Sequence, residues 1–363
     1  MRFMHLGDIH FGANWRGISK AQALVRDQEL LATFDRALDL GLRERVEVIL
    51  IAGDLFDSPL PPYGLVQEVK YRLAQFDSDM GPRILITPGN HDPWVDGSPY
   101  SEPWPASVFT FSENWECLEV AGRKIRGFGF QRHGLRTCPL PKLEGQTDIL
   151  VLHADWQAGS GSNYCPIGPE HLAAIGARYT ALGHIHKAGV VWTQAGQLAA
   201  YSGSLEPLGF DEPGQHGVWL GTLGDELKLD FVPMATREVR GFSLVIDQCQ
   251  AREQFVNLVL TSIPVAERQN YCLIRWVGDI DPRMPVPTEL KELEKEFFAL
   301  RLENNARPAY DLDGFSEYTL RSEFVKEMQL LLKETEDAEQ RAELELAIWY
   351  GLDALTWGRV MSR

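Results

Sequence analysis

Apolar runs and helically spaced apolar positions alternate along the first part of the chain. Residues 2–7, 48–52 and 83–87 are short apolar runs without polar alternation, which predicts strands buried on both faces. Residues 19–45 and 62–75 carry apolar side chains at spacings of three, four and seven, which predicts amphipathic helices between these strands. The order strand, helix, strand, helix, strand predicts a parallel sheet with right-handed crossovers.

The pattern becomes rich in strands after a loop of Pro, Trp and Ser at residues 93–105. One short helix is expected at residues 169–175. The expected strands are residues 116–120, 124–130, 147–153, 179–182, 189–193, 217–223 and 226–233. An α/β half followed by a strand-rich half predicts two sheets packed face to face, with helices outside.

The character of the chain changes again near residue 236. Two strands and two helices are expected there and predict a smaller α/β module, at residues 238–246, 251–262, 271–277 and 287–299. The remaining residues are helical and charged. Their apolar positions, from Phe324 to Leu352, pack either inside a helical hairpin or against a partner helix. The predicted domains are residues 1–235, 236–314 and 315–363.

Composition restricts the class of protein. Hydrophobic residues at 44% and charged residues at 24% of the 363-residue chain are typical of a globular protein. The net charge of −16 argues against a protein that coats nucleic acid, because such binding uses many Lys and Arg contacts to phosphate. The five cysteines are scattered and never spaced as C-x-x-C, which predicts a reduced, cytoplasmic compartment. We expect neither a classical secretion signal nor a membrane span.

Motifs with metal-ligating side chains follow the predicted strands at five points. They are Asp8 with His10, Asp54 with Asp57, Asn90 with His91 and Asp92, His153 with Asp155, and His184 with His186. Since ligands in an open α/β sheet collect beyond the carboxyl ends of the strands, we expect these side chains to meet. Carboxylate, amide and imidazole groups suit Mn²⁺, with Fe²⁺ or Mg²⁺ as alternatives, and the lack of thiolate ligands disfavours structural zinc.

The number of ligands favours two ions over one. One ion needs fewer ligands, whereas two ions that share Asp54 would use them all. Two ions about 3.5–4 Å apart suit in-line displacement at phosphorus. His91 is placed either to protonate a leaving oxygen or to hold a phosphate. Each motif alone has an ordinary explanation, as a turn, a helix cap or a pair of surface histidines, but five in series argue against coincidence.

This ordered set resembles the signature of the calcineurin-like metallophosphoesterases. More narrowly, the chain resembles the Mre11/SbcD DNA-repair exonucleases and their YhaO-like bacterial relatives. The narrower resemblance rests on residues 52–57 followed by Pro61 and Pro62, on residues 179–186 and on residues 201–204. It covers residues 1–235 strongly and the following domain weakly. It implies a four-layer αββα sandwich of two mixed sheets, a small α/β capping domain and a C-terminal helical segment.

The resemblance also implies roles and partners. One Mn²⁺ ion would be held by Asp8, His10, Asp54 and His186, and the other by Asp54, Asn90, His153 and His184. His91 would be the catalytic histidine, oriented by Asp57, where archaeal and eukaryotic members usually have His. The implied partners are DNA, a Rad50/SbcC-type ATPase gripped by the C-terminal helices, and a second copy of the chain, with residues 62–75 as the candidate dimer interface.

The resulting hypothesis is a two-metal, Mn²⁺-dependent DNA exonuclease and endonuclease in DNA repair. One alternative is a phosphodiesterase or phosphatase on small nucleotides. Another is a DNA-end tether for the ATPase, in which catalysis is secondary. The second domain and the helical tail favour a macromolecular substrate, and the intact ligand set argues against a simple tether.

The remaining candidates have structural explanations. No metal role is expected for a core histidine, His5, or for three others, His133, His171 and His216. Asp92 and Asp155 either orient ligands or stabilise turns. The segment from Tyr201 to Ser204 either touches phosphate or forms a simple turn. Trp94, Trp104 and Trp156 either stack on bases or pack their loops, and packing is the simpler expectation.

Overall fold

The computed structural model describes most of the chain, namely residues 1–77, 81–139, 146–157, 161–310, 312, 319–358 and 360. The chain divides into two compact units, Met1–Val239 and Arg240–Arg363. The second unit contains both the predicted small α/β module and the predicted helical segment. Among the described helices, none is long and apolar enough to cross a membrane.

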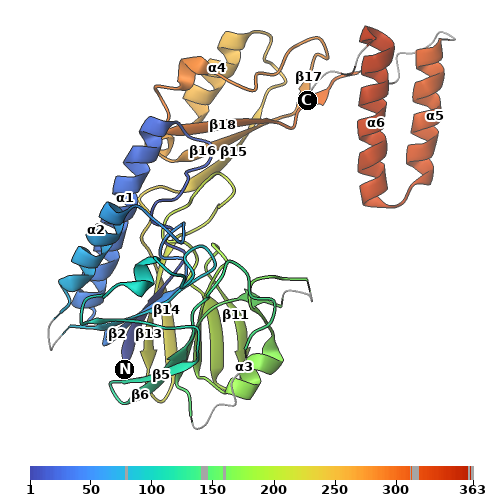
Figure 1. Cartoon of the computed structure of the whole chain (residues 1–363). Coiled ribbons are helices and arrows are strands. Elements are labelled where there is room, and N and C mark those ends of the chain that lie inside the picture. The colour runs from blue at the N-terminus through green and yellow to red at the C-terminus, as the bar shows by residue number, and fades with distance from the viewer. Residues whose placement is uncertain are drawn as a thin grey trace. The chain divides into compact units, whose positions relative to one another are not determined.

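The first sheet of the first unit is mixed and has six strands in the order β14-β13-β1-β2-β3-β4. Their bounds are β1 Arg2–Leu6, β2 Val48–Ala52, β3 Arg83–Thr87, β4 Val108–Thr110, β13 Gly217–Leu223 and β14 Leu227–Pro233. Strands β1 to β4 are parallel, which confirms the prediction for β1, β2 and β3, whereas β4 was not predicted. Strand β13 joins β1 in the antiparallel direction. Helices α1 (Lys20–Arg43) and α2 (Tyr63–Ala74) lie outside this sheet (Figure 1). Their apolar faces, including Phe34 and Val69, pack on Ile49 and Ile51 of β2.

The second sheet also has six strands, in the order β11-β12-β10-β7-β6-β5. Their bounds are β5 Glu116–Val120, β6 Arg123–Gly127, β7 Ile149–His153, β10 Tyr179–Gly183, β11 Gly189–Gln194 and β12 Gln197–Tyr201. Short strands β8 (Asp155–Trp156) and β9 (Pro166–Ile167) pair beside it, and α3 (Pro169–Ile175) covers its outer face (Figure 1).

The two sheets face each other across a buried apolar layer. Leu50 of β2 and Val151 of β7 belong to this layer. Helices therefore lie outside two packed sheets, and the predicted αββα sandwich is confirmed. Strand β12 was not predicted, and Tyr201 ends it instead of starting a loop. Gln and Ala have weak strand propensity, so pairing with β10 and β11 decides this strand.

The second unit contains a three-stranded sheet in the order β15-β16-β18. Its elements are β15 Val239–Val245, α4 Arg252–Ser262, β16 Tyr271–Val277 and β18 Ala299–Asn304, with a small pair of β17 Asp279–Ile280 and β19 Arg307–Pro308. The helix predicted at residues 287–299 is wrong. Only one 3-10 turn, η3 (Lys291–Leu293), forms there, and the chain then enters β18. Leu290, Leu293 and Phe297 have helical spacing, yet an irregular segment buries them because parallel pairing with β16 dictates the path.

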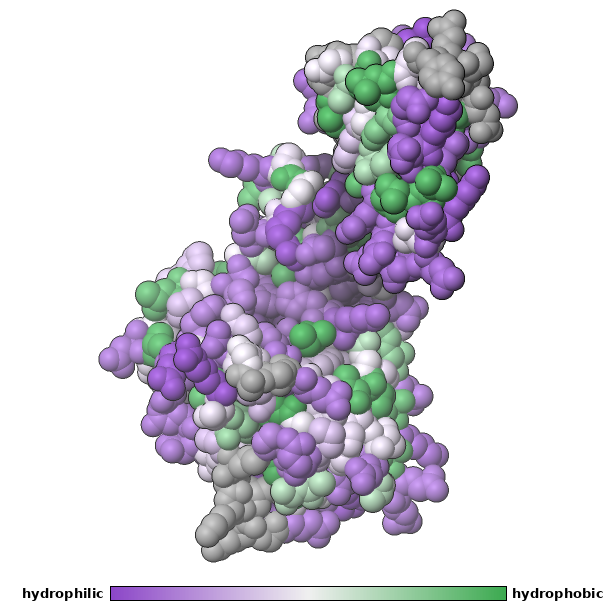
Figure 2. All heavy atoms as spheres, turned by 90° about the vertical axis from the view of Figure 1, so that its right-hand side faces the viewer, coloured by the Kyte–Doolittle hydropathy of each residue, from purple (hydrophilic) through white to green (hydrophobic). Residues whose placement is uncertain are grey.

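The C-terminal helices α5 (Leu320–Glu334) and α6 (Ala338–Trp357) form an antiparallel hairpin (Figure 1). Most of the predicted apolar stripe, including Ile348 and Leu352, packs between the two helices, so the hairpin-core interpretation is confirmed for those positions. Other apolar side chains stay outside, such as Leu330, whose exposed fraction is 51%. Figure 2 shows hydrophobic patches among hydrophilic side chains on this hairpin.

Candidate metal centre

Five strand ends from the two sheets bring the predicted ligands to one edge of the sandwich. Asp8 follows β1, Asp54 follows β2 and Asn90 follows β3, all in the first sheet. His153 ends β7 and His184 follows β10, both in the second sheet. Backbone bonds link the first two loops: the amides of Asp8 and His10 donate to the carbonyls of Gly53 and Asp54 at 3.0 Å. Ligands thus meet beyond the carboxyl ends of parallel strands, as expected.

One group of potential ligands consists of Asp8, His10 and His186, whose ligand atoms lie within 4.8 Å of one another. The Nε2 atoms of His10 and His186 are only 3.1 Å apart. Each ring has a carboxylate at its other nitrogen: His10 Nδ1 is 3.0 Å from Asp57 Oδ1, and His186 Nδ1 is 2.9 Å from Glu212 Oε1. With the Nδ1 protons donated to these carboxylates, both Nε2 atoms are directed at the same point, where a proton bridges them in the metal-free chain and a metal ion could take its place.

A second group lies beside the first and consists of Asp54, Asn90, His153 and His184. His153 Nε2 lies 3.3 Å from Asp54 Oδ2 and 2.8 Å from Asn90 Oδ1. His184 Nδ1 lies 3.2 Å from the same amide oxygen. Asp54 Oδ2 is also 3.7 Å from His10 Nε2 in the first group. Asp54 therefore lies between the two groups, where one carboxylate can contact two ions.

The two central carboxylates are buried and have histidines as neighbours. Burial raises the pKa of Asp8 above its ordinary value. Burial also acts to raise the pKa of Asp54, but the adjacent His153 and His10 outweigh it and leave that pKa below its ordinary value. Burial acts to lower the pKa of His153, yet the Asp54 carboxylate raises it to about 9. In the metal-free chain, histidines thus supply the positive charge that divalent ions would otherwise supply.

His91 and Asp57 form a pair at the open side of the two groups. The side chain of His91 is 40% exposed, and its Nδ1 lies 3.3 Å from Asp57 Oδ1. This hydrogen bond is the main reason that the pKa of His91 is raised to about 9. The backbone amide of His91 donates to Asp54 Oδ1 at 2.9 Å. The main chain of His91 thus positions a central carboxylate, while its ring remains available to a substrate.

The backbone at the site is held in unusual conformations. Asp8, His10, Asp54 and His184 all have positive φ angles, of 48°, 55°, 49° and 108°. Such angles are uncommon for residues with side chains and concentrate at functional sites. Glycine is required at Gly53, where φ is 89° and a Cβ atom would lie 2.1 Å from His153 Nδ1. At Gly89 an added Cβ would lie 2.1 Å from Asp54 Oδ1. These two glycines allow the loops to approach closely enough for their ligands to meet.

Residues that the sequence did not assign to the site lie around the candidate metal ligands. Glu212, in the loop between β12 and β13, contacts His186. Burial acts to raise the pKa of Glu212, but the hydrogen bond and charge of His186 and the amide of Leu208 together outweigh it and leave that pKa below its ordinary value. His133 Nδ1 lies 2.8 Å from the carbonyl of Asn90. For Asp92 the sequence left two roles open, orienting ligands or stabilising a turn. Its carboxylate accepts from the amides of Phe56 and Gly89 and so orients two loops that carry candidate ligands. No local pattern marks Glu212, because two acidic residues followed by a proline are typical of a solvated loop.

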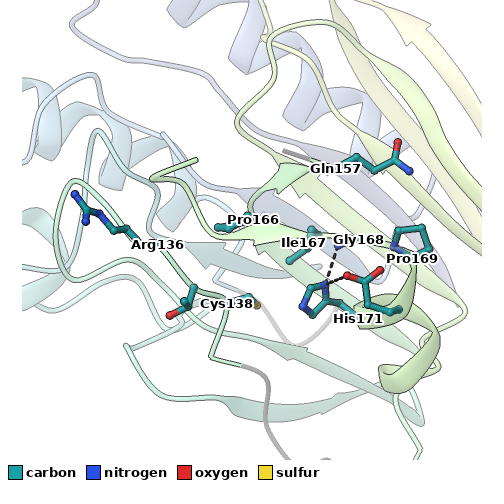
Figure 3. Close-up of a pocket in the computed structure, with 10 residues that line it drawn as sticks. Arg136, Cys138, Gln157, Pro166, Ile167, Gly168, Pro169 and His171 are labelled. Atoms are coloured by element: carbon teal, nitrogen blue, oxygen red, sulfur yellow. Dashed lines mark hydrogen bonds and ion pairs between the residues drawn. The ribbon is translucent and has the colours of Figure 1, made fainter. Parts of the chain in front are cut away.

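Other polar and aromatic candidates have the structural roles that the sequence predicted. His5 is buried, with Nδ1 2.7 Å from Tyr179 Oη. His171 Nδ1 accepts from the amide of Gly168 and contacts Glu170, at the rim of a cavity of about 680 Å³ (Figure 3). Trp94, Trp104 and Trp156 pack against the cores of the sandwich, which confirms packing as their role.

The segment from Tyr201 to Ser204 and the side chain of Asp155, whose roles the sequence left open, make hydrogen bonds within the fold. Tyr201 Oη donates to the carbonyl of Ala154 at 2.8 Å, and Ser202 and Ser204 are fully buried. Ser204 Oγ donates to Glu212 Oε2 at 3.2 Å and lies 2.9 Å from His216 Nδ1. Asp155 Oδ2 accepts from Ser162 Oγ at 2.8 Å, so it stabilises a loop.

Comparison with known families places this site in a class. The family model of the calcineurin-like phosphoesterases matches residues 1–188, more than half of the 363-residue chain. The chain belongs to that family, and its clusters of His and Asp side chains fit a site for two metal ions.

Curated relatives are distant. The chain is 28% identical over 234 residues to the uncharacterized metallophosphoesterase YhaO of Bacillus subtilis, an alignment that covers 61% of this chain and 57% of YhaO. It is 26% identical to the DNA double-strand break repair protein Mre11 of Aeropyrum pernix, over 58% of this chain and 55% of that protein. It is 24% identical to the SbcD component of the nuclease SbcCD of Escherichia coli, over 59% of this chain and 63% of that component. The chain thus spans between 55% and 63% of the length of these relatives.

Proposed function

We propose that this protein is a two-metal, Mn²⁺-dependent DNA nuclease, with exonuclease and endonuclease activity, that acts in DNA repair. The observation that carries the proposal is the complete set of carboxylate, amide and histidine ligands at one edge of the sandwich, with Asp54 between two groups. The names of two distant relatives, a DNA double-strand break repair protein and a nuclease component, support DNA as the substrate. A second α/β unit, which a small-molecule phosphatase does not need, supports a macromolecular substrate as well.

The proposed ligand sets follow the two groups of side chains. Asp8, His10, Asp54 and His186 would hold one ion, and Asp54, Asn90, His153 and His184 the other. The short Nε2 to Nε2 distance between His10 and His186 supports the first set. The convergence of His153 and His184 on Asn90 Oδ1 supports the second. Mn²⁺ is the proposed ion because oxygen and imidazole ligands without thiolates suit it, and Fe²⁺ and Mg²⁺ remain as alternatives.

The chain's own side chains can then promote hydrolysis of a phosphodiester. Two bound ions would activate a water molecule and neutralise charge on the phosphoryl oxygens. Asp57 accepts from His10 and His91 and so orients a metal ligand and the catalytic histidine together. The exposed ring of His91 would donate a proton to the departing oxygen or a hydrogen bond to the phosphate.

One experiment separates this proposal from a small-nucleotide phosphodiesterase. Purified protein with Mn²⁺ is given end-labelled duplex DNA and, in parallel, a chromogenic phosphodiester. We expect both to be cleaved, and expect the variant Asp8→Ala to cleave neither. Cleavage of the chromogenic ester alone would contradict the DNA assignment and favour the small-nucleotide function. If Mn²⁺ promotes cleavage of neither substrate, both the nuclease and the small-nucleotide phosphodiesterase are contradicted, and the DNA-end tether is favoured.

A second copy of the chain is the proposed partner at α2. The outer face of α2 exposes Tyr63 and Tyr71, by 70% and 71%, and the preceding Leu60 by 64%. A two-fold dimer would bury the same residues on both copies. We expect the protein to elute as a dimer in light-scattering chromatography and Tyr71→Glu to elute as a monomer. A monomeric wild-type protein at micromolar concentration would contradict this interface.

The hairpin of α5 and α6 is the proposed docking site for a Rad50/SbcC-type ATPase. Apolar side chains that the hairpin core leaves exposed, including Leu330 and Leu331, suit the apolar face of a coiled coil. We expect co-purification with the coiled-coil base of such an ATPase, and loss of the complex in Leu330→Glu. Exposed Val265, on the same unit but outside the hairpin, provides the matched control Val265→Glu. Equal binding by Leu330→Glu and wild type would contradict the docking site.

A further inference from the structure

Glu212 makes an unusually complete set of contacts beside the candidate metal centre. Its Oε1 accepts from His186 Nδ1 and from Arg16 Nη2, each at 2.9 Å. Its Oε2 accepts from the amide of Leu208 at 3.1 Å and from Ser204 Oγ at 3.2 Å. The side chain is 10% exposed. An ionised carboxylate has about four acceptor sites. All four are therefore used, and the side chain cannot rotate without breaking several bonds.

The contact with His186 determines which nitrogen of that ring can bind a metal. A carboxylate at Nδ1 stabilises the tautomer with a proton on Nδ1 and a lone pair on Nε2. This Nε2 is the atom that lies 3.1 Å from His10 Nε2. The opposite ring is held in the same way, because His10 Nδ1 lies 3.0 Å from Asp57 Oδ1. Two carboxylates, from separate loops, thus aim two histidines at one point.

The second group of ligands lacks this arrangement at the positions described. His153 Nδ1 lies 3.1 Å from the backbone carbonyl of Ala52, which is a neutral acceptor, whereas the carboxylate oxygen Asp8 Oδ1 is 3.9 Å away, beyond hydrogen-bond distance. His184 turns its Nδ1 toward Asn90 Oδ1 and therefore toward the other ligands. A carboxylate behind a histidine makes the ring a stronger donor to a metal than a neutral carbonyl does. The difference distinguishes the two candidate ion positions chemically.

We propose that Glu212 is a positioning residue that holds His186 in the metal-binding tautomer and so sets the affinity of the ion bound by Asp8, His10 and His186. This inference rests on the proposed ligand set for that ion. Arg16 and Ser204 keep the carboxylate in place, so these two side chains support the metal centre through Glu212. Loss of Glu212 therefore weakens the binding of that ion and not of the second ion, because the ligands of the second ion do not contact this carboxylate.

Titration of the metal-free protein tests the proposal. Mn²⁺ is added to wild type, Glu212→Gln and Glu206→Gln, and binding is measured by calorimetry and by the electron paramagnetic resonance signal of free Mn²⁺. Glu206 is a matched control, because it lies in the same loop, is buried and pairs with Arg26, away from the ligands. We expect wild type to bind two Mn²⁺ ions. In Glu212→Gln one of these ions should bind roughly 10- to 100-fold more weakly than in wild type. In Glu206→Gln both ions should bind with wild-type affinity.

Two further readouts distinguish positioning from folding and from a wrong ligand set. The visible spectrum of added Co²⁺, which reports ligand geometry, should change in Glu212→Gln and not in Glu206→Gln. A Glu212→Gln titration and spectrum that superimpose on those of wild type would overturn the role of Glu212. In that case His186→Ala still tests the ligand set: loss of one ion would leave the proposed function intact, and retention of both would overturn the ligand set itself.

Discussion

Replacing His91 by asparagine separates the two roles that its position allows. The ring contacts Asp57 Oδ1 at 3.3 Å, whereas the link to the ligands is the backbone amide, which donates to Asp54. The variant His91→Asn keeps this amide. Asp57 also keeps its 3.0 Å contact with His10. Because the ring is 40% exposed, its removal leaves no buried cavity, and we expect a change in unfolding free energy of less than about 1 kcal/mol.

The catalytic effect should be much larger than the structural one. The hydrogen bond to Asp57 is the main reason that the pKa of His91 is raised, to about 9 in the metal-free chain, and it favours a protonated ring that can serve as a general acid. A positioned general acid contributes about 10²–10⁴ in rate, which is roughly 3–5 kcal/mol of transition-state stabilisation. We therefore expect kcat for DNA cleavage to fall by about this factor in His91→Asn, with two Mn²⁺ ions still bound.

Two substrates identify the chemical role. The sugar oxygen that leaves from DNA is strongly basic and needs a proton, whereas p-nitrophenolate leaves without one. If His91 is a general acid, His91→Asn loses far more activity on DNA than on bis-p-nitrophenyl phosphate. Equal losses on both would refute proton donation and leave phosphate binding as the role of His91. The control His171→Asn, at a histidine on α3, should keep both activities, and full activity in His91→Asn would refute either role.

Two further perturbations test the centre and its surroundings. Asp54→Ala removes the carboxylate between the two groups and should release both ions, as elemental analysis of the dialysed protein would record; retention of two ions per chain would contradict a bridging role. Burial lowers the pKa of His5 to about 3 from 6.5, so the unfolded chain takes up a proton first as the solution is acidified. Metal-free wild type should therefore lose about 1 kcal/mol of stability per pH unit relative to His5→Gln between pH 6 and pH 4, and the difference in slope should fall to about half at pH 6.5 and vanish at higher pH. Urea unfolding at several pH values measures this difference, and parallel profiles for the two proteins would contradict the assignment.

Most of the sandwich could be predicted because its signals are local. The apolar run at residues 48–52 is long enough for one strand and too short for a helix, and Ser19 both accepts from the amide of Gln22 and begins α1. The predicted ligands could also be found, since each stands directly after such a run. Their order along the chain was sufficient to indicate a two-metal phosphoesterase.

Long-range contacts decided the rest. Strand β18 replaces the helix predicted at residues 287–299, because pairing with β16 outweighs the helical spacing of three apolar residues. Positive φ angles at Asp8 and Asp54 arise because two loops bond to each other across the sheet edge. The sequence by itself predicted most strands of the sandwich and the candidate ligands, because these signals depend on neighbouring residues. Only the tertiary structure decided that Glu212 belongs to the centre, because His186 and Glu212 meet through folding and no local pattern connects them.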